Sequence, residues 1–100
     1  MRVVIKTRLL DKTIMVKGRE VPVFGLASLT VSPERKGIGS LALELFEDLA
    51  IQNDKYAVVA FTTKEVLPFY IKFGWSICGA FADRIAVSSV PLQTTFNEKW

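Results

Sequence analysis

Residues 29–50 read L29-T-V-S-P-E-R-K-G-I-G-S-L-A-L-E-L-F-E-D-L-A50, and this stretch predicts a strand, a tight turn and a long helix. The strand begins earlier, at Val21, because the odd positions from there to Val31 are all apolar, as in a strand with one buried face. Pro33 ends the strand, since proline has no N–H to donate to a neighbouring strand. From Ile38 the apolar residues recur with a helical period, which predicts a helix over residues 38–52.

The predicted helix has an apolar side and a polar side. We expect its buried stripe to contain Ile38, Ala42, Leu45 and Leu49, flanked by Leu41 and Phe46. The polar side is expected to carry Glu44, Glu47, Asp48 and Gln52.

The turn before this helix has features of a phosphate site. Gly37 and Gly39 allow a tight turn and a close approach of a ligand to the backbone. A helix N-terminus adds unpaired N–H groups and the positive end of the helix dipole. Arg35 and Lys36 bring positive charge to the same turn. Two glycines could also serve only to connect a strand to a helix, but the combination favours phosphate binding.

Two segments resemble motifs of the GNAT family of N-acetyltransferases. Residues Val31–Leu41 resemble the family's coenzyme A motif, V-x-P-E followed by Gln/Arg-x-x-Gly-x-Gly/Ala. The segment L67-P-F-Y-I-K-F-G-W75 resembles its F-Y-x-x-x-G-[FW] motif. The two matches occur in the family's order, and the resemblance covers roughly Val21–Phe81. It implies an acyl-CoA N-acyltransferase-like fold and acetyl-CoA as the co-substrate, with an amine as acceptor.

The resemblance also assigns site residues. In the family, the two parallel strands on either side of the helix splay apart beyond a bulge, and the pantetheine arm of coenzyme A pairs with the first strand. It therefore implies that the cofactor-binding residues are Leu29, Thr30, Val31, Arg35, Lys36, Gly37, Ile38, Gly39 and Ser40. Tyr70 matches the tyrosine that donates a proton to the departing thiolate. The family's usual glutamate position falls near Phe24, and Glu20 is the nearest carboxylate, so no general base is assigned.

Differences from the family pattern leave an alternative function open. The turn is shorter than in the family, and Glu34 falls at the Gln/Arg position. The family's N-terminal strand and two helices have no counterpart before residue 2, so we expect a single truncated domain over residues 1–100. These differences favour a degenerate relative that binds coenzyme A or a partner without catalysis.

The composition excludes several classes of protein. Half of the residues are hydrophobic, as in a globular chain. No histidine is present, which excludes His-based metal sites and Ser-His or Cys-His catalysis, and no metal site is predicted. The single cysteine, Cys78, is expected to be a small core residue. With neither a signal-peptide pattern nor a long apolar run, the sequence predicts a cytoplasmic protein without membrane contact.

The net charge of +3 is concentrated at the N-terminus, where residues 1–19 contain six basic residues and one acid. A basic module that binds nucleic acid is a second alternative. Charged residues also protect the exposed edge of a sheet. We favour the edge strand, because these residues have no interleaved aromatic side chains.

The remaining pattern completes an α/β (α+β) fold, in which an antiparallel meander is followed by a parallel pair with two helices. We expect strands at residues 2–10, 13–17, 56–61, 75–81 and 85–90, turns at 11–12 and 17–20, and a helix within 62–74. Trp75, Ile77 and Phe81 are expected to share one face of a strand. Two helices are too few to cover both faces of this sheet, so we expect a homodimer. Its expected anchors are Trp100, Phe96 and Phe81.

Overall fold

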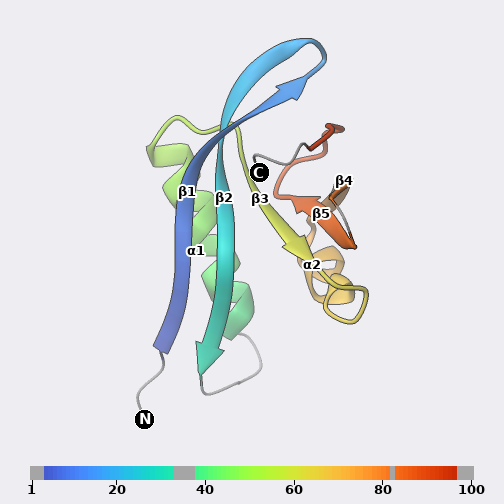
Figure 1. Cartoon of the computed structure of the whole chain (residues 1–100). Helices are drawn as coiled ribbons and strands as arrows, with labels where there is room; N and C mark the ends of the chain where they lie inside the picture. Colours follow the sequence, from blue (N-terminus) through green and yellow to red (C-terminus); the bar gives the residue numbers. More distant parts are fainter. Residues whose placement is uncertain (1–3, 33–37, 82, 97–100) are drawn as a thin grey trace.

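The computed structural model describes residues 4–32, 38–81 and 83–96, and only the backbone of residues 4–6, 27–32, 38–40 and 81 within them. Its elements, in chain order, are β1 (Val4–Val16), β2 (Arg19–Ser32), α1 (Ile38–Gln52), β3 (Ala57–Thr62), α2 (Leu67–Phe73), β4 (Ser76–Phe81) and β5 (Arg84–Ser88). The strands form one sheet in the order β1-β2-β3-β5-β4 (Figure 1). Neighbouring strands are antiparallel, except that β2 and β3 are parallel. A small α+β fold with a mixed sheet and two helices, as predicted, is therefore confirmed.

The hairpin of β1 and β2 closes with a two-residue turn. Lys17 and Gly18 both have positive φ, 51° and 78°, between the paired residues Val16 and Arg19. Positive φ at both central residues is the signature of a type I′ turn, whose twist matches that of the flanking strands. The predicted hairpin turn is confirmed.

The predicted turn at Asp11 and Lys12 is wrong, because both residues lie within β1. Asp11 pairs with Phe24 of β2. Its carboxylate also forms an ion pair of 2.9 Å with Lys55, whose Nζ lies 5.2 Å from the centre of the Phe24 ring. Pairing with the long β2 keeps β1 extended through a locally turn-like dipeptide. The expected three-stranded meander is therefore a two-stranded hairpin.

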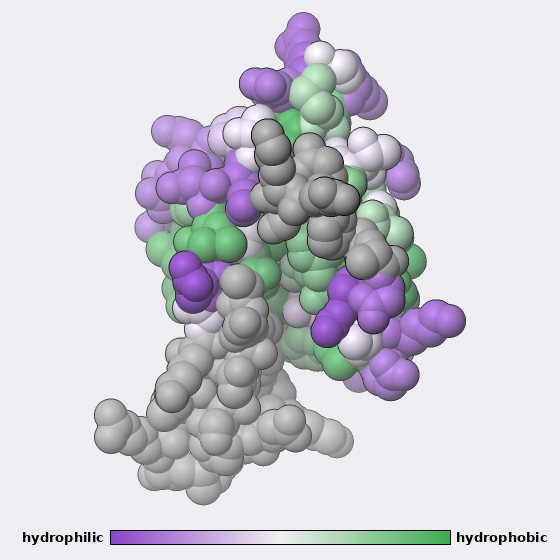
Figure 2. All heavy atoms as spheres, viewed as in Figure 1, coloured by the Kyte–Doolittle hydropathy of each residue, from purple (hydrophilic) through white to green (hydrophobic). Residues whose placement is uncertain are grey.

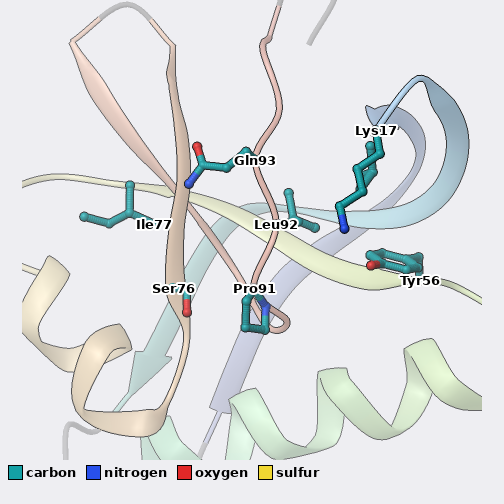
Figure 3. A pocket seen from close by; sticks show the side chains of 8 residues that line it. Lys17, Tyr56, Ser76, Ile77, Pro91, Leu92 and Gln93 are labelled. Atoms are coloured by element: carbon teal, nitrogen blue, oxygen red, sulfur yellow. The ribbon is translucent and has the colours of Figure 1, made fainter.

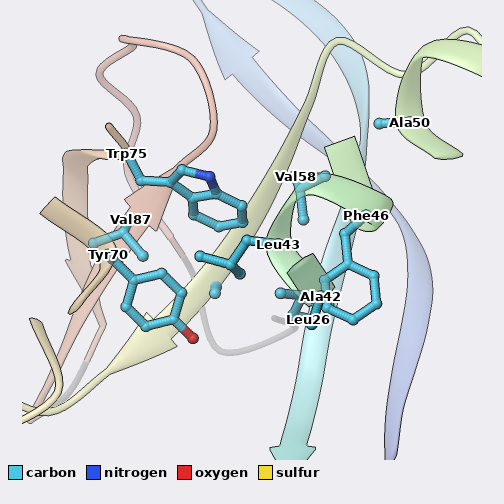
Figure 4. Packing of buried hydrophobic residues seen from close by; sticks show 10 residues of the cluster. Leu26, Ala42, Leu43, Phe46, Ala50, Val58, Tyr70, Trp75 and Val87 are labelled. Carbon is cyan, nitrogen blue, oxygen red and sulfur yellow. The ribbon is translucent and has the colours of Figure 1, made fainter. Parts of the chain in front are cut away.

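Both helices pack on one face of the sheet, behind the strands in Figure 1. Their side chains join those of the strands in a cluster that we call the helix-side cluster (Figure 4), which contains Leu26, Ala42, Leu43, Phe46, Ala50, Val58, Ala60, Tyr70, Trp75 and Val87. Leu43 and Val58 are fully buried, and each such side chain stabilises the fold by about 1.5–3 kcal/mol. Neither α1 nor α2, the helices of the described residues, has the length and apolarity needed to cross a membrane.

The predicted buried stripe of α1 is partly wrong. Ala42 is buried as expected, but Leu41 and Leu45 are 63% and 51% exposed. Leu43 and Ala50, outside the predicted stripe, are buried instead. Apolar residues of several kinds occur around most of this helix, so the sequence period identifies the helix without defining its rotation against the sheet.

The opposite face of the sheet is covered in part by residues 91–96. A second cluster on this face, the segment-side cluster, contains Ile14, Val23, Ala57, Val59, Cys78, Ala86 and Leu92. The N–H of Thr94 donates to the carbonyl of Cys78 over 3.0 Å, and the Phe96 ring meets the Phe61 ring edge to face at 5.1 Å. Phe96 therefore packs at least in part on its own chain. Figure 2 shows this face, on which apolar side chains are visible between polar ones.

The segment around α2 agrees with the sequence except on one point. Pro68 lies in the first turn of α2, and Gly74 ends the helix with a φ of 103°. Trp75 is buried at 2% exposure, whereas Ile77 is 48% exposed, so the two do not share a face as predicted. Trp75 precedes β4, which begins at Ser76, so the alternation of this strand does not extend back to Trp75. The side chain of Phe81 and all of Trp100 lie outside the described residues.

Candidate functional site

The first feature of the site is an irregularity in β2. Val4–Lys6 of β1 pair with Thr30–Ser32 of β2, and from Arg8 the partner becomes Ala27. Ser28 and Leu29 therefore lie opposite a single residue, Thr7. Two residues facing one constitute a β-bulge, which bends the strand and increases its twist.

The second feature is the separation of β2 from β3. Their parallel pairing runs from Val23–Ala57 to Leu26–Ala60, and Leu26–Ala60 is the last pair of the register. Both strands continue further, β2 to Ser32 and β3 to Thr62. Their ends diverge in Figure 1, and we call this separation of the two backbones beyond Leu26 and Ala60 the gap.

Leu29, Thr30 and Val31, three of the predicted binding residues, lie on β2 beside this gap. Thr30 and Val31 pair with β1 on one side. A strand directs main-chain N–H and C=O groups to both sides, and β3 is not paired with β2 here. The β2 edge at the gap can therefore form hydrogen bonds with an extended ligand, independently of its side chains.

The N-terminus of α1 lies at the same end of the sheet. Ile38, Gly39 and Ser40 form its first turn, as predicted. N–H groups in a first turn have no partner within the helix, and the helix dipole makes this end positive. Arg35, Lys36 and Gly37 of the predicted phosphate turn lie outside the described residues.

Tyr70 projects from α2 into the helix-side cluster, which also contains the last paired residues of β2 and β3, Leu26 and Ala60. Its ring is 5% exposed and packs against Phe69 and Trp75, at centroid distances of 5.3 and 5.4 Å. The hydroxyl points away from Trp75 in Figure 4 and has no hydrogen-bond partner among the described residues. Burial raises the pKa of Tyr70, so the phenol remains protonated at neutral pH.

One contact near Tyr70 was not predicted from the sequence. The indole N–H of Trp75 donates to Oε1 of Glu47 in α1 over 3.1 Å. The sequence places Glu47 on the polar side of α1 and gives no signal for this contact, which joins residues far apart in the chain. Burial, reinforced by Asp48 and Glu44, raises the pKa of Glu47, although the Trp75 hydrogen bond opposes the shift.

Two other candidates are excluded from the chemistry. Glu20 lies at the tip of the hairpin, paired with Met15, at the opposite end of β2 from the bulge. Cys78 is fully buried, and burial raises the pKa of its thiol to about 11. A thiol with that pKa is protonated and unreactive at neutral pH, so Cys78 is a core residue as predicted.

No protein-family model and no curated protein matches this chain.

Proposed function

We propose that this chain is an acetyl-CoA-dependent N-acetyltransferase that transfers an acetyl group to an amine acceptor in the cytoplasm. The observation that carries the proposal is the gap between β2 and β3, which begins beside the bulge at Ser28 and Leu29. The GNAT resemblance implies a gap of this kind for the pantetheine arm. Its amide groups would pair with the main chain of Leu29–Val31.

The phosphates of coenzyme A fit the same end of the sheet. The first turn of α1 supplies N–H donors, and no Asp or Glu lies in the first turn of that helix. The resemblance adds Arg35, Lys36 and Gly37 to this group. The site thus combines a pairing edge for the polar arm with a positive helix end for the pyrophosphate.

Tyr70 is proposed as the proton donor of the transfer. As the acceptor nitrogen bonds to the acetyl carbon, the carbon–sulfur bond breaks and the electron pair remains on sulfur. The Tyr70 phenol gives its proton to that thiolate, and a buried, protonated phenol suits this role. The amine must also lose a proton, and we assign no residue to that step.

Coenzyme A binding without catalysis is the second candidate. The position of Glu20 favours it, because this carboxylate lies at the far end of β2 and cannot deprotonate an amine at the gap. This alternative uses the same pairing edge and the same helix end, so the two candidates differ in turnover and not in binding.

Calorimetric titration with acetyl-CoA tests both candidates. We expect the wild-type chain to bind, and Gly37→Asp combined with Gly39→Asp to abolish binding by placing side chains and negative charge at the phosphates. Met15→Asp is the control, since it adds the same negative side chain at a residue of the hairpin that is 48% exposed, far from the bulge. Circular dichroism verifies that each variant is folded. Equal affinity in the double variant and the wild type would refute the phosphate site, and acetyl transfer to an amine would separate the enzyme from the binding protein.

A further inference from the structure

A cavity of about 400 Å³ lies at the other end of the sheet (Figure 3). Its walls come from the hairpin turn, the residue before β3, the start of β4 and residues 91–93. Pockets of roughly 300–1,000 Å³ hold small organic molecules. The cavity is therefore large enough for a small ligand. It lies beside Tyr56, just before β3, whereas the gap lies beyond Ala60.

One part of the wall is apolar. Leu92 belongs to the segment-side cluster and Val16 packs against that cluster, so this wall is continuous with the core. Ile77 is 48% exposed although its side chain is apolar. A ligand with an apolar body would remove Ile77 from water and extend the cluster.

The other part of the wall is polar and positive. Lys17 extends from the turn toward Tyr56, and Gln93 lies between the hairpin and β4 (Figure 3). Lys17 is the charged residue of this lining, which includes no acid. Among the described residues, Lys17 has no ion-pair partner, and the Tyr56 hydroxyl and Gln93 amide have no hydrogen-bond partner. The type I′ turn fixes the backbone of Lys17 at the rim.

We propose that this cavity binds a small monocarboxylic acid with an apolar body. One cation matches one carboxylate, whereas a nucleotide or a diphosphate carries more negative charge than Lys17 balances. The Tyr56 hydroxyl, toward which Lys17 extends, can donate to the same carboxylate, and the apolar body lies against Ile77 and Leu92.

The test is a titration of the ¹⁵N-labelled chain with 3-phenylpropionate, followed by two-dimensional NMR. The amide signals of Tyr56, Ile77 and Gln93 should shift together, whereas that of Tyr70 should not. The neutral analogue 3-phenylpropionamide should bind about fivefold more weakly, the size expected for an exposed ion pair. Lys17→Asn removes the charge and tolerates the positive φ, so it should abolish this preference.

Arg19→Gln is the control, because it removes a neighbouring exposed cation that does not line the cavity. This variant should keep the preference for the acid. The proposal is overturned if millimolar 3-phenylpropionate leaves the three signals unmoved, if acid and amide bind equally, or if Lys17→Asn retains the preference. Acetyl-CoA titrated into the same sample reports separately on the gap.

Discussion

The indole N–H of Trp75 donates a hydrogen bond of 3.1 Å to Oε1 of Glu47, and this contact connects the end of α2 to α1. Trp75 also packs against Tyr70, at a centroid distance of 5.4 Å. The helix proposed to hold phosphate and the residue proposed to donate a proton are therefore linked through one indole ring. Glu47 is partly buried, which makes this link sensitive to pH.

Glu47→Gln should change the pH dependence of stability. Burial raises the pKa of Glu47 above its ordinary value of 4.5, so the folded chain holds this proton more tightly than the unfolded chain does. The stabilisation from the protonated carboxyl is complete below pH 4.5 and is lost as the pH rises through the raised pKa. Glutamine keeps an acceptor oxygen for Trp75 but does not titrate.

Urea unfolding at pH 4 and pH 7 measures this difference. The unfolding free energy of Glu47→Gln, relative to the wild type, should increase between the two pH values. In Trp75→Phe the hydrogen bond that lowers the pKa is absent, so carbon-detected NMR should find the Glu47 pKa higher still. A relative stability of Glu47→Gln that is independent of pH would show that Glu47 is not perturbed.

Tyr70→Phe should reduce kcat by about 100-fold or more, the lower limit for a general acid, with little change in the acetyl-CoA dissociation constant. The hydroxyl acts only when the thiolate departs, so its removal affects the reaction and not binding. Steady-state kinetics with a primary-amine acceptor, together with calorimetric titration, provide the two measurements. An unchanged kcat would assign Tyr70 to packing alone.

Patterns among neighbouring residues predicted the helices and strands better than they predicted the contacts between them. The helix at 38–52 and the end of α2 at Gly74 follow from residue periods and from a glycine at positive φ, which are properties of neighbouring residues. The continuous β1 could not be predicted in this way, because Asp11 and Lys12 are kept extended by pairing with Phe24 and Val23 of another strand, and Asp11 by its ion pair with Lys55.

In the candidate site, too, some features were predicted from the sequence and others depend on contacts between distant residues. The resemblance places Leu29, Thr30 and Val31 beside the parallel pair, and they lie at the gap between β2 and β3. The bond between Glu47 and Trp75 depends on how α1 is rotated against the sheet, and no local pattern in the sequence specifies that rotation.

Gly79→Ala should destabilise the chain by about 1–3 kcal/mol, as expected for overpacking. A Cβ on Gly79 would lie 2.7 Å from the carbonyl oxygen of Thr94 and 3.0 Å from Cε2 of Phe96. Residues 94–96 would have to move, which weakens the hydrogen bond from Thr94 to Cys78 and the contact between Phe96 and Phe61.

Urea unfolding of Gly79→Ala, Phe96→Ala and the double variant checks this explanation. The two changes should be less than additive, because each loosens the same segment. Full additivity would mean that Gly79 and Phe96 do not act through a shared contact.

The last prediction concerns assembly. We expected from the sequence that one face of the sheet would be uncovered. Residues 91–96 cover part of that face, so the outer surface of α1 is the better candidate for a homodimer interface. Leu41 and Leu45 lie four residues apart on that surface and are 63% and 51% exposed. Light scattering at micromolar concentration should give the mass of a dimer. Leu41→Glu combined with Leu45→Glu should give a monomer, since it adds charge beside Glu44 on both copies, whereas Met15→Glu, at an apolar residue 48% exposed on the hairpin, should not. A monomeric wild type, or a dimer that survives the double substitution, would contradict this interface.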